Sequence, residues 1–502
     1  MATSSSISYP NFKSPLRCVC RALYQSRSRW RCLAEKRGEA LGQIRRELRR
    51  AEAKNRDLVA RLKSSQRQLD RIEAQLATEQ PCTQWKPLPG HQYSAEVIAL
   101  CCQLSLLIGF RAVPQVLKCV CDTFGLSINI PKRDAVRNWS CRNGVAILQE
   151  PAVAKDWIWM VDHSVQLGKM FVLVVLGIRR TDLPKDRPLR RQDMSPLMVQ
   201  STASRNKHQV SQQLADVARL YGTPISVLCD GAAELKEGVK SLESLGFQGV
   251  CLDDTKHKVA NLLKRTLGKD KRFLAFEARL GPTIAAIQQT ELAYLLPPRK
   301  KTKCRFMNFD RLIDWAIMVL RHLDDPVTSP QIVHKLGWLR EFRDDLEPWQ
   351  ACRQLIGRVL SQANQHGVYR GVTSALEKCL AEVNTNSDFV CQLRQELIFL
   401  YRRNEEKLSS FNDPTIRLPC STELLESAFG SFKAIQRHHN RGTFTSLLAV
   451  FPTLFDPCTP KMIRKRFSSV SNQALKTWLQ QSGLTDSTQA RRTKAYKLPA
   501  IA

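Results

Sequence analysis

The chain has 502 residues, which is too long for one compact hydrophobic core, so we expect two to four domains. Lys and Arg total 77 against 46 Asp and Glu, a formal net charge of +31. Such an excess favours a polyanionic partner, usually nucleic acid, with an anionic membrane surface as the competing interpretation. No run of about 18 apolar residues occurs and the N-terminus lacks an apolar signal core, so we expect no transmembrane helix and no membrane partner.

The cysteines do not indicate a disulfide framework. There are 17 of them, and no two have the Cys-x-x-Cys spacing. A disulfide framework would be unusual in a chain of this size, so we expect a reducing, cytosolic setting and no cysteine-rich zinc site.

The first predicted element is a long helix over residues 41–76. Its apolar residues recur at alternating steps of three and four, which indicates a coiled coil, and the alternative is a helix packed on its own domain. A single Asn in the seam is a device that fixes register and a two-stranded state, so we expect a homodimer or higher oligomer. The residues at successive a positions are Leu41, Leu48, Asn55, Leu62, Leu69 and Leu76.

Residues 93–150 predict three helices, the last over residues 130–148. Helices joined by a short turn, with a last helix rich in Arg and Asn, suit a helix-turn-helix that reads DNA. A plain helical scaffold is the alternative. The candidates for the exposed, DNA-binding side of the last helix are Arg133, Arg137, Asn138 and Arg142.

The pattern changes after residue 150. Five apolar runs predict strands and two amphipathic segments predict helices, in the order β-β-β-α-β-α-β. The first and fourth predicted strands each end on an aspartate. These residues are Asp162 and Asp230. The predicted strands cover residues 155–164, 169–180, 196–202, 223–230 and 249–254, and the helices cover residues 208–222 and 234–246.

A further amphipathic helix is predicted over residues 421–440. Glu423 and Glu426 lie beside its apolar stripe, and Lys433 lies seven residues after Glu426. Seven helical steps return to within about 20° of the starting direction, so Glu426 and Lys433 share a face. These side chains either form a solvated polar face or complete a site that begins far upstream.

The strand order and the placement of the acids together resemble the DDE/D transposases of prokaryotic insertion sequences, over roughly residues 93–455. The resemblance implies an RNase H-like catalytic fold in which Asp162, Asp230 and Glu426 are the catalytic residues and the ligands of Mg²⁺, with Mn²⁺ as a substitute. It also implies that Lys433 contacts a DNA phosphate near the cut. The spacing from Glu426 to Lys433 matches the Glu and Lys of the Y-R-E-K signature, whereas Pro419 and Thr422 stand where its Tyr and Arg would fall.

Asp254 and His257 match a [C/D]-x-x-H pattern that several such transposases carry between the second Asp and the Glu. The alternative is that Asp254 caps a helix and His257 packs beside it. A basic stretch at residues 299–305 contains Arg299, Lys300 and Lys301, which either follow a DNA backbone or form a solvated loop.

The expected fold class is α/β, an RNase H-like mixed sheet with a large all-α insertion, preceded by a helical DNA-binding domain and a coiled coil. The resemblance implies a transposase that cleaves transposon ends and joins them to target DNA in the bacterial cytoplasm, associated with the nucleoid. A nuclease or junction resolvase, and a catalytically silent DNA-binding regulator, are the alternatives.

The expected domains follow in chain order, and the last is expected to be partly disordered and to contact DNA without specificity. They are residues 1–92 (basic arm, coiled coil and linker), 93–150 (DNA binding), 151–270 (first part of the catalytic core), 271–410 (insertion), 411–458 (last part of the core) and 459–502 (basic tail).

Overall fold

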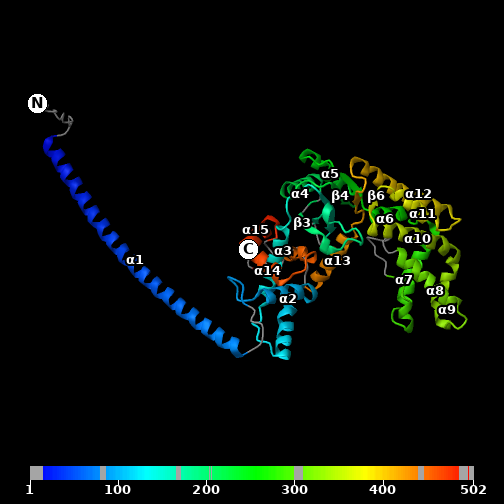
Figure 1. The fold of residues 1–502 in the computed structure, drawn as a ribbon, viewed down its shortest axis with the longest axis horizontal. Coiled ribbons are helices and arrows are strands. Elements are labelled where there is room, and N and C mark those ends of the chain that lie inside the picture. Colours follow the sequence, from blue (N-terminus) through cyan, green and yellow to red (C-terminus); the bar gives the residue numbers. More distant parts are fainter. Residues whose placement is uncertain are drawn as a thin grey trace, which may run out of the picture. The chain divides into compact units, whose positions relative to one another are not determined.

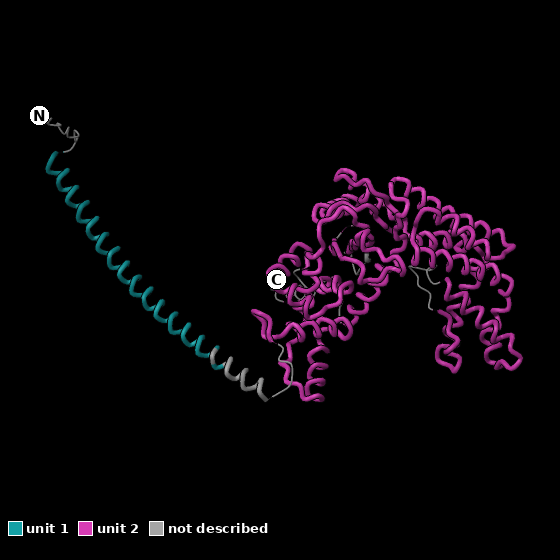
Figure 2. Tube along the Cα trace, in the orientation of Figure 1, with its two compact units in different colours: residues 1–85 teal, residues 86–502 magenta. Residues whose placement is uncertain are grey.

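The computed structural model describes residues 15–79, 86–165, 171–202, 204, 206–298, 309–438, 446–484 and 496. The chain forms two compact units, Met1–Trp85 and Lys86–Ala502 (Figure 2). It is a mostly helical α/β protein with a five-stranded mixed sheet and a long N-terminal helix, so the expected α/β class is confirmed.

The described part of the first unit is one helix, α1 (Leu16–Glu79), which contains the predicted helix and extends it by about a further 25 residues toward the N-terminus. Its seam carries large apolar side chains that are each more than half exposed in this single chain: Leu41, Ile44, Leu48, Leu58 and Leu62. Apolar seams of this kind are normally buried between paired helices. The pairing of two chains through α1 stays a prediction.

The sheet contains the five strands that the sequence predicts, in the spatial order β3-β2-β1-β4-β5. The first three strands pair antiparallel, whereas β4 pairs parallel to β1 and β5 pairs parallel to β4. Helices α4 (Lys207–Tyr221) and α5 (Ala233–Ser241) make the two crossovers that these parallel pairs require. The strands are β1 (Trp157–Val165), β2 (Phe171–Arg179), β3 (Ser195–Thr202), β4 (Ser226–Cys229) and β5 (Val250–Asp253).

Both faces of the sheet are buried. Alternate residues of a strand point to opposite faces, so Trp159 and Val161 pack with α4 and α5, whereas Ile158 and Met160 belong to the larger core on the other face. Figure 1 shows α4 and α5 on one side of the strands and α3 (Arg133–Leu148) and α13 (Glu423–Arg437) on the other. This burial explains the near-continuous apolar text of β1 and β2.

The helices before the sheet are α2 (Ala95–Phe124) and α3 (Arg133–Leu148). Gly109 adopts a φ of 75° and divides α2 into the two predicted helices, because a left-handed backbone interrupts a right-handed helix. All three predicted helices are therefore confirmed.

Among the described residues, α2 is the one helix that is long and apolar enough to cross a membrane, and half of its most apolar window is buried in the protein. No run of about 18 apolar residues marks this helix in the sequence, because polar residues such as Gln103 and Ser105 interrupt its apolar text. A buried core helix has the same length and composition.

The expectation that Arg142 lies on the exposed side of α3 is wrong. Its guanidinium is buried and donates to the carbonyl oxygens of Val470, at 2.5 Å, and Phe467, at 2.6 Å. Every residue from Trp139 to Leu148 is buried, because three later elements pack on α3. These elements are η8 (Ser446–Leu454), α14 (Pro460–Ser469) and α15 (Asn472–Gln481). Of the other candidates, Arg133 and Arg137 are exposed and Asn138 is half-buried.

The segment after β5 is helical, as expected for residues 271–410, with one correction. Two residues form a strand, β6 (Val368–Tyr369), which pairs with β7 (Arg417–Leu418) outside that segment. Arg299, Lys300 and Lys301 lie outside the described residues. The helices are α6 (Thr255–Thr266), α7 (Lys271–Ile287), α8 (Phe309–Asp324), α9 (Pro330–Leu336), α10 (Arg343–Gln365), α11 (Val372–Ala381) and α12 (Asp388–Glu406).

Short 3-10 helices connect many of these elements. They are η1 (Arg180–Asp182), η2 (Arg191–Asp193), η3 (Leu242–Leu245), η4 (Glu291–Leu295), η6 (Gly337–Phe342), η7 (Lys407–Ser410) and η8 (Ser446–Leu454).

The last described helices are α13 (Glu423–Arg437), α14 (Pro460–Ser469) and α15 (Asn472–Gln481). Residues 460–484 of the expected basic tail are folded as part of the second unit. Arg466 of α14 has a fully buried side chain that forms ion pairs with Glu150, at 2.8 Å, and Asp456, at 2.5 Å. Residues 485–495 and 497–502 lie outside the described part.

Candidate catalytic and metal-binding site

Three aspartates lie in one row on β1, β4 and β5. Asp162 lies inside β1, which continues to Val165 instead of ending at Asp162 as expected, whereas Asp230 and Asp254 come directly after β4 and β5. Val161 pairs with Cys229, and Cys229 pairs with Asp253, so the next residues in register are Asp162, Asp230 and Asp254. Neighbouring strands are about 4.8 Å apart, and residues in register on parallel strands point to the same face. The row follows Met160, Leu228 and Leu252, which belong to the core on the face where α13 lies.

Asp162 is a buried carboxylate, and its Oδ1 accepts a hydrogen bond of 2.6 Å from the backbone N–H of His163. Burial, followed by the negative charge of Asp230, raises the pKa of Asp162 to about 7. The charges of His257 and Glu426 act on the same carboxyl, with opposite signs. Asp162 and Glu426, which are more than 260 residues apart in the sequence, are therefore close enough for their charges to interact.

Asp230 is half-buried at the turn after β4. Its Oδ1 accepts a 2.9 Å hydrogen bond from the N–H of Ala232, and Gly231 between them adopts a φ of 86°. That left-handed conformation suits glycine and lets the chain turn directly after the carboxylate. The turn thus holds the Asp230 side chain at the end of the strand.

Asp254 is the structural link between this row and α13. Its side chain is fully buried and accepts from the N–H of Lys256 at 2.7 Å, which caps α6 as the sequence suggested. The second oxygen, Oδ2, contacts His257 Nδ1 at 2.8 Å and accepts a hydrogen bond from the hydroxyl of Thr422. Because Thr422 immediately precedes α13, Asp254 fixes the start of that helix against α6.

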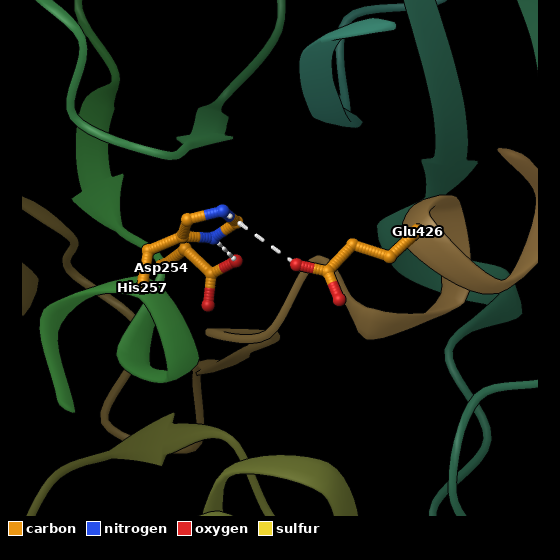
Figure 3. A group of neighbouring side chains, drawn as sticks. All are labelled: Asp254, His257 and Glu426. Atoms are coloured by element: carbon orange, nitrogen blue, oxygen red, sulfur yellow. Dashed lines mark hydrogen bonds and ion pairs between the residues drawn. The ribbon is translucent and has the colours of Figure 1, made fainter. Parts of the chain in front are cut away.

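His257 lies between Asp254 and Glu426 (Figure 3). Its Nε2 is 3.6 Å from Glu426 Oε1, whereas its other ring nitrogen, Nδ1, contacts Asp254. Burial lowers the pKa of His257, but the hydrogen bond to Asp254 and the charges of Asp254, Glu426 and Asp162 outweigh it and raise that pKa to about 9. The imidazole is therefore held as a cation among the acids.

Among the residues that the structure describes, Asp254, His257 and Glu426 have ligand-type atoms that all lie within 4.8 Å of one another. The [C/D]-x-x-H pattern thus lies at the predicted site as well as capping a helix. Asp162 and Asp230 are outside this trio, although both strand acids face the same space. The predicted meeting of Asp162, Asp230 and Glu426 around a metal pair remains untested.

Glu423 and Glu426 share one cation. Lys256 Nζ lies 3.2 Å from Glu423 Oε1 and 3.2 Å from Glu426 Oε2. Glu423 is the more exposed, with 49% of its side chain accessible against 24% for Glu426. Asn364 also donates a 2.8 Å hydrogen bond to Glu423.

Lys256 is the contact that sequence reasoning missed, although it lies inside the [C/D]-x-x-H pattern. Burial lowers its pKa, and the charges of Glu426 and Glu423 more than compensate, so that the pKa is raised. Lys433 is exposed on α13, two turns beyond Glu426, and its contact with a DNA phosphate remains a prediction.

No protein-family model matches the chain, and no curated protein is significantly similar to it.

Proposed function

We propose that this protein is a DDE-type transposase, which cleaves the ends of a mobile DNA element and joins them to target DNA by metal-dependent phosphoryl transfer. The observation that carries the proposal is the register of Asp162 and Asp230 on paired parallel strands, with Glu426 facing them from a helix that follows a long helical insertion. The β-β-β-α-β-α-β order and the mixed sheet support an RNase H-like core.

The donor set suits a divalent cation. Asp162, Asp230 and Glu426 offer carboxylate oxygens, the donors that Mg²⁺ prefers. The pKa of Asp162 is raised by burial and by Asp230 although the charge of His257 lowers it, so its ionised form is only partly compensated and a bound cation would complete the balance. We assign Asp162, Asp230 and Glu426 as the residues that hold Mg²⁺, or Mn²⁺ as a substitute.

The protein's own side chains have separate tasks at this site. The chemistry that the metal supplies when bound is stabilisation of charge on the attacking and leaving oxygens of the phosphodiester. Asp254 positions α13, and with it Glu426, through Thr422. Lys256 balances the charge of Glu426 and Glu423 in the absence of other cations.

The formal charge of +31 attracts DNA, which both the cleavage and the joining reactions need.

Two element ends must be cut and joined together, which suits two chains paired through α1. Light scattering of the full chain and of a variant without residues 1–85 tests that pairing, and the full chain should be at least dimeric whereas the variant should not. Equal, monomeric masses with and without DNA would contradict it.

The function is tested by incubating the full-length protein with the DNA that flanks its reading frame and Mg²⁺. We expect cleavage at the element ends and joined products, and Asp162→Asn, Asp230→Asn or Glu426→Gln should each lower the rate roughly 10³-fold or more while DNA binding is kept. Glu423→Gln is the matched control and should retain most activity.

Each other outcome contradicts a defined part of the proposal. Cleavage without joined products would indicate a nuclease or resolvase. DNA binding without cleavage would indicate a silent regulator. Normal cleavage by Glu426→Gln in Mg²⁺ would overturn the assignment of the third ligand.

A further inference from the structure

A cavity of about 480 Å³ lies beside the acidic site. Its walls come from the connection between β2 and β3, from the end of α10 and the residues after it, and from the start of α13. Met160 of β1 and Glu423 of α13 belong to the lining, which places the cavity next to the row of strand acids. Its volume falls within the range of about 300–1,000 Å³ that is typical of small-molecule sites.

One wall of the cavity is apolar. Leu183, Pro184, Pro188 and Leu189 of the β2–β3 connection line it. Arg187 lies among them, but its guanidinium forms a bidentate pair with Asp193, at 2.6 and 2.7 Å, so its charge is already balanced. This wall therefore offers a surface for a flat, weakly polar group.

Two arginines in the lining keep their charge unbalanced. Arg191 donates to the hydroxyl of Ser427 at 2.5 Å. Arg417 donates to the backbone carbonyls of His366, at 2.6 Å, of Lys185, at 3.1 Å, and of Gln365. Within the described part of the chain, neither forms an ion pair with a carboxylate. Burial lowers the pKa of Arg191, as expected for a partly desolvated cation without an anion beside it.

One carboxylate, Glu423, also faces the cavity. Lys256 and Asn364 both bind it, so its charge is balanced from within the protein. The net character of the cavity is therefore positive on one side and apolar on the other. A guanidinium fork matches the oxygens of a phosphate, which makes phosphate the anion that Arg191 and Arg417 suit best.

We propose that this cavity binds one nucleotide of a DNA strand, with its phosphate against Arg191 and Arg417 and its base against the apolar wall. The inference rests on the proposed function, because the cavity adjoins the site where DNA would be cut. A phosphorylated peptide offers the same anion, but it lacks the flat base that the wall of prolines and leucines accommodates.

The test measures binding of deoxyadenosine monophosphate to the full-length protein by titration calorimetry in the presence of EDTA. We expect saturable binding, with deoxyadenosine and inorganic phosphate each at least about tenfold weaker, because each lacks one half of the ligand. Arg191→Gln should weaken the nucleotide about tenfold or more through loss of a charge-assisted contact, whereas Arg191→Lys should recover part of it. Arg219→Gln is the matched control, because it removes an equal charge from an exposed residue that is paired with Asp216 on α4.

The proposal is overturned if deoxyadenosine monophosphate does not bind, if Arg191→Gln binds it as the wild type does while melting normally, or if a phosphoserine peptide binds more tightly. Because the measurement needs neither metal nor cleavage, it separates this inference from the proposed function. Asp162→Asn should keep nucleotide binding even where it abolishes cleavage.

Discussion

Two buried aspartates of the same sheet, Asp162 on β1 and Asp253 on β5, have opposite electrostatic surroundings. By the alternation of the strands, they point to opposite faces. Asp253 has lysines at 3.0, 3.3 and 3.9 Å, namely Lys236, Lys258 and Lys407. Burial alone would raise its pKa, but these lysines lower it.

Asp162 instead has a negatively charged neighbour, the carboxylate of Asp230. Burial and this charge raise the pKa of Asp162 to about 7. The comparison teaches that burial of a charge does not by itself reveal its purpose. Where the protein supplies the counterions, as at Asp253, the charge stabilises the fold. Where the nearest strand neighbour repels it, as at Asp162, the charge opposes folding and the arrangement suits an external cation.

We expect the greatest loss of stability when a buried cation, Arg466, is replaced. Arg466→Met removes the positive member of a buried cluster and leaves Glu150 and Asp456 facing each other. We expect a loss of about 3–5 kcal/mol in the free energy of unfolding, measured by denaturant titration. Arg464→Met on the same helix is the control, because its exposed pair with Glu96 should contribute less than about 1 kcal/mol. Equal losses from both variants would show that the buried cluster is not charge-balanced.

The second prediction concerns the balanced aspartate. Asp253→Asn leaves three lysines without their shared anion, so we expect a loss of roughly 1–3 kcal/mol near neutral pH. The folded pKa of Asp253 is lowered, so its stabilisation is present above the unfolded pKa of about 3.9 and is lost as the pH falls through the folded pKa. Unfolding of the wild type and of the variant between acid and neutral pH measures this, and a pH-independent difference would contradict it.

The same substitution at Asp162 should change the free energy of unfolding in the opposite direction. Its folded pKa of about 7 exceeds the unfolded value of about 3.9, so stability is fully present below the unfolded pKa and is lost as the pH rises through the folded one. In EDTA, Asp162→Asn should therefore be nearly neutral at acid pH and stabilising above pH 7, by up to about 4 kcal/mol because the folded and unfolded pKa values differ by about three. A lower melting temperature for Asp162→Asn at alkaline pH would refute the idea that this carboxylate is incompletely compensated.

Local patterns predicted most of the fold. The five strands and the helices around them follow from apolar runs, period-3.6 stripes and turn residues such as Gly125, which caps α2. The strand acids Asp162 and Asp230 were visible for the same reason, because each ends an apolar run. These are features that neighbouring residues determine, so one sequence suffices to read them.

The features that sequence reasoning missed depend on partners far along the chain. Arg142 and Arg466 looked like surface residues, but their partners are 325 and 316 residues away. The link from Asp254 to Thr422 spans 168 residues, and neither residue alone signals it. The exposure of a charged side chain is set by tertiary packing, which periodicity does not report.

We expect the acids around Asp162 to bind a divalent cation, which Mn²⁺ binding measured by electron paramagnetic resonance can show. The wild type should bind Mn²⁺, and Asp162→Asn should bind it at least about tenfold more weakly, because one charged ligand is lost. Asp253→Asn, the same change on the opposite face, should leave the affinity unchanged. Wild-type affinity in Asp162→Asn, or an equal loss in both variants, would contradict the claim.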